Sequence, residues 1–128
     1  MPQVAIVDDD AGVVRALKRL LALQSIQAYT FCSGKEFIDF IERGPQPALD
    51  CIILDIHMDG MSGLDVQRYL MDKAITTPIV FVSSAVERHI HDQAIAAGAV
   101  AFFNKPFAPD ALIDSLQNAI ASRLDGNA

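Results

Sequence analysis

Polar or charged side chains stand at the points where apolar runs of this sequence end. They are Asp8 and Asp9 near the N-terminus, Asp55 in the middle of the chain, Ser83, and Lys105 near the C-terminus. Three carboxylates in one crevice repel one another and attract a divalent cation, and oxygen ligands suit Mg2+. An aspartate accepts a phosphoryl group when a metal ion and a lysine offset the charge on the transferring oxygens. These residue types therefore predict a phosphoryl-transfer site with Asp55 as nucleophile, Lys105 as cation and Ser83 as hydrogen-bond donor.

Short apolar runs supply the strands that must position these groups. Four of them lack alternation, as strands buried on both faces of a parallel sheet do, and lie at residues 4–7, 51–54, 79–82 and 100–103. A fifth run, at residues 27–31, is more polar and is typical of a strand near a sheet edge.

Helix signals separate the strands. Capping patterns at Asp10, at Ser33 with Glu36, and at Ser62 with Asp65 begin the first three helices. The Gly-Pro-Gln-Pro stretch at residues 44–47 ends the second helix, and the third runs to about Lys73. A weakly apolar helix is expected over residues 86–97, and a final helix begins at Pro109.

Five strands alternating with five helices predict an α/β fold, a doubly wound, five-stranded parallel sheet with helices on both faces. In such a sheet the ligand site lies beyond the carboxyl ends of the strands, at a switch point. With the flavodoxin-like strand order 2-1-3-4-5, which we adopt as a hypothesis, that point falls between the first and third strands. Asp8 and Asp55 end those two strands. The fold thus predicts that the polar groups converge.

Length and composition set further limits. The 128 residues fit one domain, expected over residues 1–124, with residues 125–128 as a frayed tail or the start of a linker. The chain is 52% hydrophobic, with mean hydropathy +0.29, but it contains no apolar run of roughly 18 residues that could span a bilayer. The N-terminus lacks the basic region of a signal peptide, so a soluble cytoplasmic protein without membrane contact is expected.

The net charge of −6 opposes phosphate contacts and argues against direct nucleic-acid binding by this chain. Cys32 and Cys51 have no metal-ligand spacing, and both are expected to be buried and free of a disulfide. His89 and His91 are two residues apart on a predicted helix, so they do not face one another and are expected to be surface residues without a metal.

Five segments resemble the signature blocks of response-regulator receiver domains and together span nearly the whole chain. They are Val7-Asp8-Asp9-Asp10, Leu54-Asp55-Ile56-His57-Met58, Met61-Ser62-Gly63, Val82-Ser83 and Asn104-Lys105-Pro106-Phe107. The resemblance implies that Asp55 accepts a phosphoryl group from a phosphohistidine on a sensor kinase or phosphotransfer protein. It implies a signalling switch that catalyses only its own phosphoryl transfer and slow hydrolysis, rather than an enzyme acting on a separate substrate.

The resemblance also assigns roles to individual residues. Asp9 and the backbone carbonyl of His57 would bind Mg2+ directly, beside Asp55, with Asp8 acting through water. Lys105 would pair with the phosphoryl group, and Pro106 would follow a cis peptide bond. Ser83 and Phe102 would form the switch pair that alters the surface of the fourth helix, fifth strand and fifth helix. A downstream output domain or target protein is the expected partner, with homodimer formation on phosphorylation left open.

Two departures from the family pattern concern Asp59 and the pair His57 and Ala85. Asp59 stands where the family most often has proline, so we hypothesise a more mobile loop whose extra carboxylate sometimes reaches the cation. His57 and Ala85 lie two residues beyond the nucleophile and the hydroxyl. In the family that this chain resembles, these positions modulate how water reaches the phosphoryl group, and here one is bulky and the other small. A change of His57 to alanine is accordingly expected to alter the autodephosphorylation rate.

Two other functions fit parts of the pattern. A receiver-like docking module would use the fold without phosphorylation, but such modules usually lack one of the acidic residues or the lysine, and this chain has them all. A magnesium-dependent phosphatase of the haloacid-dehalogenase type also uses an aspartate at a strand end. That family needs a second aspartate two residues on, where this chain has His57.

Overall fold

The computed structural model describes residues 1–44, 48–84 and 86–126, with side chains described up to residue 122. Within these residues the chain alternates between strands and helices. The strands are β1 (Gln3–Val7), β2 (Gln27–Phe31), β3 (Cys51–Leu54), β4 (Ile79–Ser83) and β5 (Ala101–Asn104). The helices are α1 (Ala11–Leu23), α2 (Gly34–Glu42), α3 (Gly63–Asp72), α4 (Arg88–Ala96) and α5 (Pro109–Gly126).

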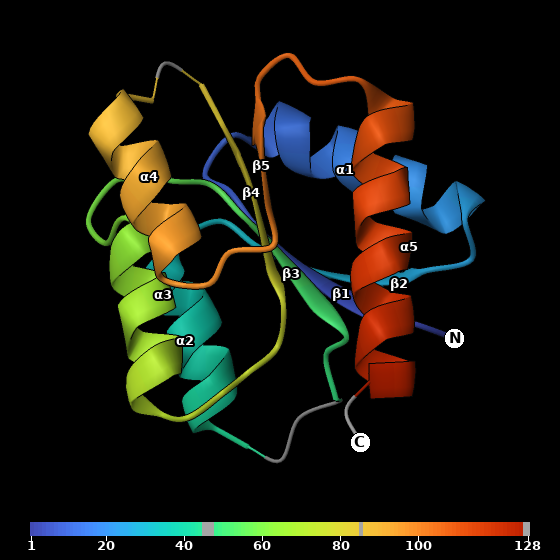
Figure 1. The fold of residues 1–128 in the computed structure, drawn as a ribbon, viewed down its shortest axis with the longest axis horizontal. Coiled ribbons are helices and arrows are strands. Elements are labelled where there is room, and N and C mark those ends of the chain that lie inside the picture. Colours follow the sequence, from blue (N-terminus) through green and yellow to red (C-terminus); the bar gives the residue numbers. More distant parts are fainter. Residues whose placement is uncertain (45–47, 85, 127–128) are drawn as a thin grey trace.

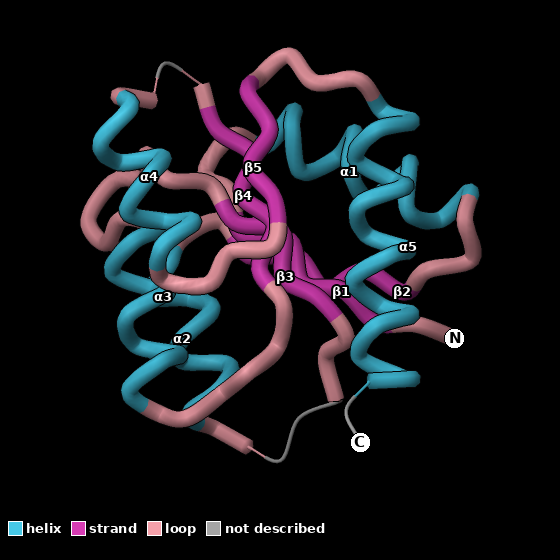
Figure 2. The backbone as a smooth tube through the Cα atoms, viewed as in Figure 1, coloured by secondary structure: helices cyan, strands magenta, loops and turns pink. Residues whose placement is uncertain are grey.

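The strands form one parallel sheet in the order β2-β1-β3-β4-β5, which confirms the predicted topology. Figure 1 shows the sheet between two helical layers, with α2, α3 and α4 on one face and α1 and α5 on the other. The tube view in Figure 2 shows the same layers, with the strands stacked at the centre. All residues of β3 and β4 are buried, as expected of central strands covered on both faces.

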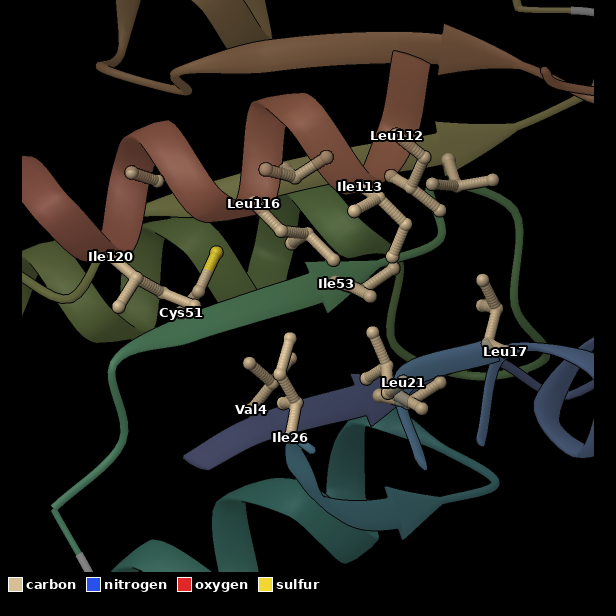
Figure 3. Close-up of a cluster of buried hydrophobic side chains, with 14 residues drawn as sticks. Val4, Leu17, Leu21, Ile26, Cys51, Ile53, Leu112, Ile113, Leu116 and Ile120 are labelled. Carbon is tan, nitrogen blue, oxygen red and sulfur yellow. The ribbon is translucent and has the colours of Figure 1, made fainter. Parts of the chain in front are cut away.

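Each face of the sheet has its own hydrophobic core. On one face, Val4 and Ile53 pack against α1 and α5, and Cys51 lies in the same cluster (Figure 3). On the other face, Phe81 and Phe37 lie in a cluster that includes residues of α2, α3 and α4. Because side chains alternate along a strand, successive residues of β1 and β3 point alternately into the two cores.

Local capping signals account for where the helices begin. Asp10 caps α1 by accepting hydrogen bonds from two backbone amides. Ser62 and Asp65 form the predicted capping box at the start of α3. At α2 only half of the predicted box forms: Ser33 caps the helix by accepting from the Glu36 amide, but the Glu36 carboxylate turns to Cys32 instead of the Ser33 amide.

The prediction that both cysteines are buried is wrong for Cys32, whose side chain is exposed, and right for Cys51. Cys32 follows the last residue of β2, in the turn that enters α2. There its amide and its thiol donate to the two oxygens of Glu36, at 3.1 and 3.3 Å. The two cysteines are not joined by a disulfide.

Smaller differences concern element ends. The last strand begins one residue later than predicted, leaving Val100 53% exposed. Helix α5 continues to Gly126, so the two described residues of the expected tail are helical, and residues 127 and 128 lie outside the described part. The proline residues expected to end α2 also lie outside it, at residues 45–47. No helix in the described part is long and apolar enough to cross a membrane.

Candidate functional site

The sheet itself fixes the backbone at the candidate site. Hydrogen bonding continues past the strands: the Asp55 amide donates to the Val7 carbonyl at 3.0 Å, and the Asp8 amide donates to the Phe31 carbonyl at 3.1 Å. At the other side, the Lys105 amide donates to the Ser83 carbonyl at 2.8 Å. The backbone at all three positions is therefore tied to the carboxyl edge of the sheet, as the strand pattern predicted.

Asp55 is the most heavily contacted carboxylate of the site and is only 5% exposed. Its Oδ1 accepts a 2.6 Å hydrogen bond from the Ser83 hydroxyl and a 3.3 Å bond from the His57 amide. Its Oδ2 faces the Lys105 ammonium at 3.3 Å. A buried carboxylate with a hydroxyl and an ammonium beside it is the arrangement expected of a phosphoryl acceptor, because both donors can stabilise added negative charge.

Lys105 bridges the two buried carboxylates. Its Nζ lies 2.8 Å from Asp8 Oδ2 as well as 3.3 Å from Asp55, and its side chain is 17% exposed. Burial, only partly offset by the hydrogen bond from Lys105, raises the pKa of Asp8 above its usual range. Burial lowers the pKa of Lys105, but the neighbouring carboxylates of Asp8 and Asp55 outweigh it and hold that pKa above its usual value. Lys105 therefore stays charged beside two carboxylates.

The three carboxylates predicted to bind a cation do converge. Asp8, Asp9 and Asp55 can each present one oxygen such that all three atoms lie within 4.8 Å of one another. Asp9 is exposed, whereas the other two are buried, so the cluster opens to solvent on one side. An oxygen-only donor set in an open position fits Mg2+, which usually keeps several waters.

The loop after Asp55 meets the carboxylate cluster through its backbone. The Asp59 amide donates a 3.2 Å hydrogen bond to Asp9 Oδ2. A proline at position 59 could not make this bond, because it has no amide hydrogen. The side chains of Asp59 and His57 are exposed. The reach of the Asp59 carboxylate to a cation stays a prediction, and Ala85 lies outside the described residues.

Phe102 lies at the β5 side of the site and is half-buried. Its ring stacks on Phe81 of β4, with centroids 5.7 Å apart, and contacts the His91 ring of α4 at 4.8 Å. The peptide bond between Lys105 and Pro106 is cis, the isomer expected there. The sequence suggested Phe102 as a switch residue but placed His91 simply at the surface.

Sequence reasoning missed the close packing of Gly63 under Asp55. A Cβ atom at Gly63 would collide with the Asp55 carbonyl oxygen and lie 2.9 Å from the Ile56 Cα. Gly63 also donates its amide to the Ile56 carbonyl at 2.9 Å. Its position as the first residue of a capped helix gave no hint of this contact, which depends on the path of the preceding loop.

Gln67 was also missed. It is only 3% exposed, and its amide nitrogen donates to the Ala94 carbonyl of α4 at 3.0 Å. Its place between Val66 and Leu70, on the inward stripe of α3, was the available signal. This bond ties α4 to α3.

Comparison with known proteins gives a consistent result. Residues 4–117 match the family described as the response regulator receiver domain. The response regulator protein TodT of Pseudomonas putida is 38% identical over 117 residues, which cover 91% of this chain and 50% of that protein. The transcriptional regulatory protein TdiR of Thauera aromatica is 34% identical over 92% of this chain and 51% of its own length. The chain thus spans about half the length of these relatives.

Solved structures agree. The crystal structure of a response regulator receiver protein from Burkholderia phymatum has a TM-score of 0.83 and 39% identity, covering 94% of this chain and 96% of that one. A structure of the response regulator StyR has a TM-score of 0.86 and 32% identity, covering 97% of this chain and 61% of that one.

Proposed function

The chain belongs to the response-regulator receiver family of two-component signalling, and from this and the geometry of its site we propose that it is a switch operated by phosphorylation of Asp55. The observation that carries the proposal is the convergence on one buried carboxylate of the Ser83 hydroxyl and the Lys105 ammonium, at 2.6 and 3.3 Å. Both groups can donate to the oxygens of an incoming phosphoryl group.

In the transfer step, a carboxylate oxygen of Asp55 attacks the phosphorus of a phosphohistidine. The P–N bond breaks as the O–P bond forms, and the bonding electrons return to the imidazole. Lys105 and Ser83 stabilise the transferring oxygens, and Asp8 keeps Lys105 oriented through their 2.8 Å contact. Asp9, Asp55 and the His57 carbonyl, with Asp8 acting through water, would hold Mg2+, which would supply positive charge at the site.

The switch step uses groups that are already in contact with the acceptor. Ser83 is fully buried and directed at Asp55, so an added phosphoryl group must displace its hydroxyl or take its hydrogen bond. Ser83 pairs with Asn104 in the sheet and Phe102 pairs with Phe81, so the hydroxyl and the aromatic ring lie on adjoining strands. We propose that a shift at Ser83 is read out by Phe102 and by the surface of α4, β5 and α5.

The partners follow from the same proposal. A sensor histidine kinase or phosphotransfer protein supplies the phosphoryl group. TodT and TdiR are about twice as long as this chain, and TdiR is named a transcriptional regulatory protein. We propose that the switched surface controls an output domain or a separate target protein.

The test is labelling by a small phosphodonor, such as phosphoramidate, in the presence of Mg2+. The wild-type protein should incorporate acid-labile phosphate at up to one group per chain, and Asp55→Asn should incorporate none. Asp72→Asn, at an exposed aspartate at the end of α3, is the control and should be labelled like the wild type. Labelling of Asp55→Asn at the wild-type level would refute the assignment.

A further inference from the structure

Phe102 is held between two aromatic rings that come from different elements. Phe81 lies on its β4 side and is fully buried, so it provides a fixed surface for stacking at 5.7 Å. His91 lies on the α4 side at 4.8 Å, with the two ring planes tilted by 56°. Tilted aromatic pairs at this separation are attractive beyond the area that they bury. The position of Phe102 therefore depends on a side chain that α4 supplies.

The direction of His91 follows from how α4 is anchored. The Gln67 amide holds the Ala94 carbonyl, and Ala94 itself is fully buried. Residues three apart share one face of a helix, so anchoring Ala94 places His91 toward the sheet. The His91 side chain remains 45% exposed, unlike His89, whose side chain is 69% exposed and pairs only with Glu87 within the described residues.

We propose that His91 is a positioning residue for the switch: its ring holds Phe102 against Phe81 and so stabilises the arrangement in which the Ser83 hydroxyl lies at Asp55. This inference rests on the proposed function, since it concerns how phosphorylation of Asp55 is coupled to α4. The Phe102 position and the Ser83 to Asp55 hydrogen bond occur together in this structure. Strengthening one should therefore favour the other.

Contacts on α4 itself also orient the His91 ring. Its Nδ1 lies 3.1 Å from Asp92 Oδ1, and the other Asp92 oxygen lies 3.8 Å from Arg88 Nε. On β5 the side chain that faces the His91 ring is Phe102. The imidazole is therefore held from two sides, by a carboxylate on its own helix and by an aromatic ring on the strand.

The experiment measures the affinity of the protein for beryllofluoride with Mg2+, a stable mimic of the phosphoryl group. The mimic favours the shifted positions of Ser83 and Phe102, so releasing Phe102 from the His91 ring should help the mimic to bind. His91→Ala should therefore strengthen binding by about two- to tenfold, the range expected for loss of one aromatic pair. His91→Phe keeps a ring against Phe102 and should bind close to the wild-type affinity.

His89→Ala is the matched control on the same helix and should bind like the wild type. Affinity of His91→Ala that equals or falls below that of the wild type would overturn the proposal for His91. A wild-type protein that binds no beryllofluoride more tightly than Asp55→Asn would instead overturn the proposed function. Thermal unfolding of each variant establishes that the proteins compared are folded, and His91→Ser, which also removes the ring, tests the contact if His91→Ala is unstable.

Discussion

The acceptor site and helix α4 lie at neighbouring parts of the sheet but are held in different ways. Around Asp55, short charged contacts join side chains that are nearly all buried, and backbone hydrogen bonds continue the sheet beneath them. Helix α4 begins at Arg88, and its N-cap residue, Glu87, makes no side-chain capping hydrogen bond. Among described residues, its polar link to the rest of the fold is the Gln67 bond, supplemented by the His91 ring contact. A rigid site beside a lightly anchored helix suits a switch, because elements of low local stability are those that move.

The largest expected effect is on the rigid acceptor site around Asp55. Gly63→Ala should lower the free energy of unfolding by more than about 3 kcal/mol, because the new methyl group collides with backbone atoms of Asp55 that cannot yield. Urea denaturation measures the change. Gly60→Ala is the control, since its Cβ would meet nothing within 4 Å and only its φ of +81° disfavours alanine. Equal losses at the two glycines would contradict the described packing.

The second prediction concerns the cation of the site. Lys105→Met should lower the free energy of unfolding by about 2 kcal/mol, because two carboxylates that are 3% and 5% exposed would lose their counter-ion. Lys35→Met is the matched control. The Lys35 ammonium lies 2.9 Å from the Asp39 carboxylate, about as close as Lys105 lies to Asp8, but the two side chains are 79% and 50% exposed. The free energy of unfolding should therefore hardly change.

The pH dependence gives the sign of the Lys105 effect. The pKa of Lys105 is raised above its ordinary value in the folded protein, so the contribution of Lys105 to stability is fully present below that ordinary value and is lost as the pH rises through the folded-state pKa. The gap between wild type and Lys105→Met should therefore narrow in strongly alkaline solution. A gap that widens there would count against the ion pairs.

The third prediction concerns the hydrogen bond that anchors α4 to α3. Gln67→Leu removes the buried hydrogen bond to the Ala94 carbonyl and should lower the free energy of unfolding by about 1 kcal/mol. The loss stays small because the Ala94 carbonyl still accepts a hydrogen bond from the Ala99 amide at 3.1 Å. Hydrogen exchange should become faster in α4 while β1 and β3 keep their protection. Gln93→Leu, exposed on α4, should leave exchange unchanged. Uniformly faster exchange would mean that α4 is not a separate unit.

The smallest expected effect sharpens the role of the loop. Asp59→Pro removes the amide that binds Asp9 and should weaken Mg2+ binding by roughly two- to tenfold, the value of one exposed hydrogen bond to a carboxylate. Asp59→Ala keeps the amide and removes only the carboxylate, so it should lose less affinity than Asp59→Pro. Titration followed by NMR measures both. A loss confined to Asp59→Ala would show that the side chain, rather than the backbone, serves the cation.

The acceptor site around Asp55 is the part of the molecule that the sequence predicts well. Asp8, Asp55, Ser83 and Lys105 each follow an apolar run, and parallel pairing brings the ends of such runs to one edge. The pattern of residue types therefore contains both the position and the chemistry of these groups. The predicted convergence needed no detail of side-chain packing.

The contacts of α4 and of the loop after Asp55 are less predictable from the sequence. The apolar stripe of α4 is thin, so the pattern does not set the rotation of the helix that brings His91 to Phe102. The hydrogen bond from Asp59 to Asp9 is donated by the backbone amide. Almost every residue type has such an amide, so the sequence does not indicate this bond. Cys32 was misassigned for a similar reason, since a small apolar residue one position beyond a strand can face either way.

Hydrogen exchange with and without beryllofluoride and Mg2+ tests most directly whether a phosphoryl group on Asp55 is read out through α4. The account predicts changed exchange in α4 and β5 of the wild-type protein, unchanged protection in β1 and β3, and no response in Asp55→Asn. Beryllofluoride binding at Asp55 that leaves exchange in α4 and β5 unaltered would contradict it.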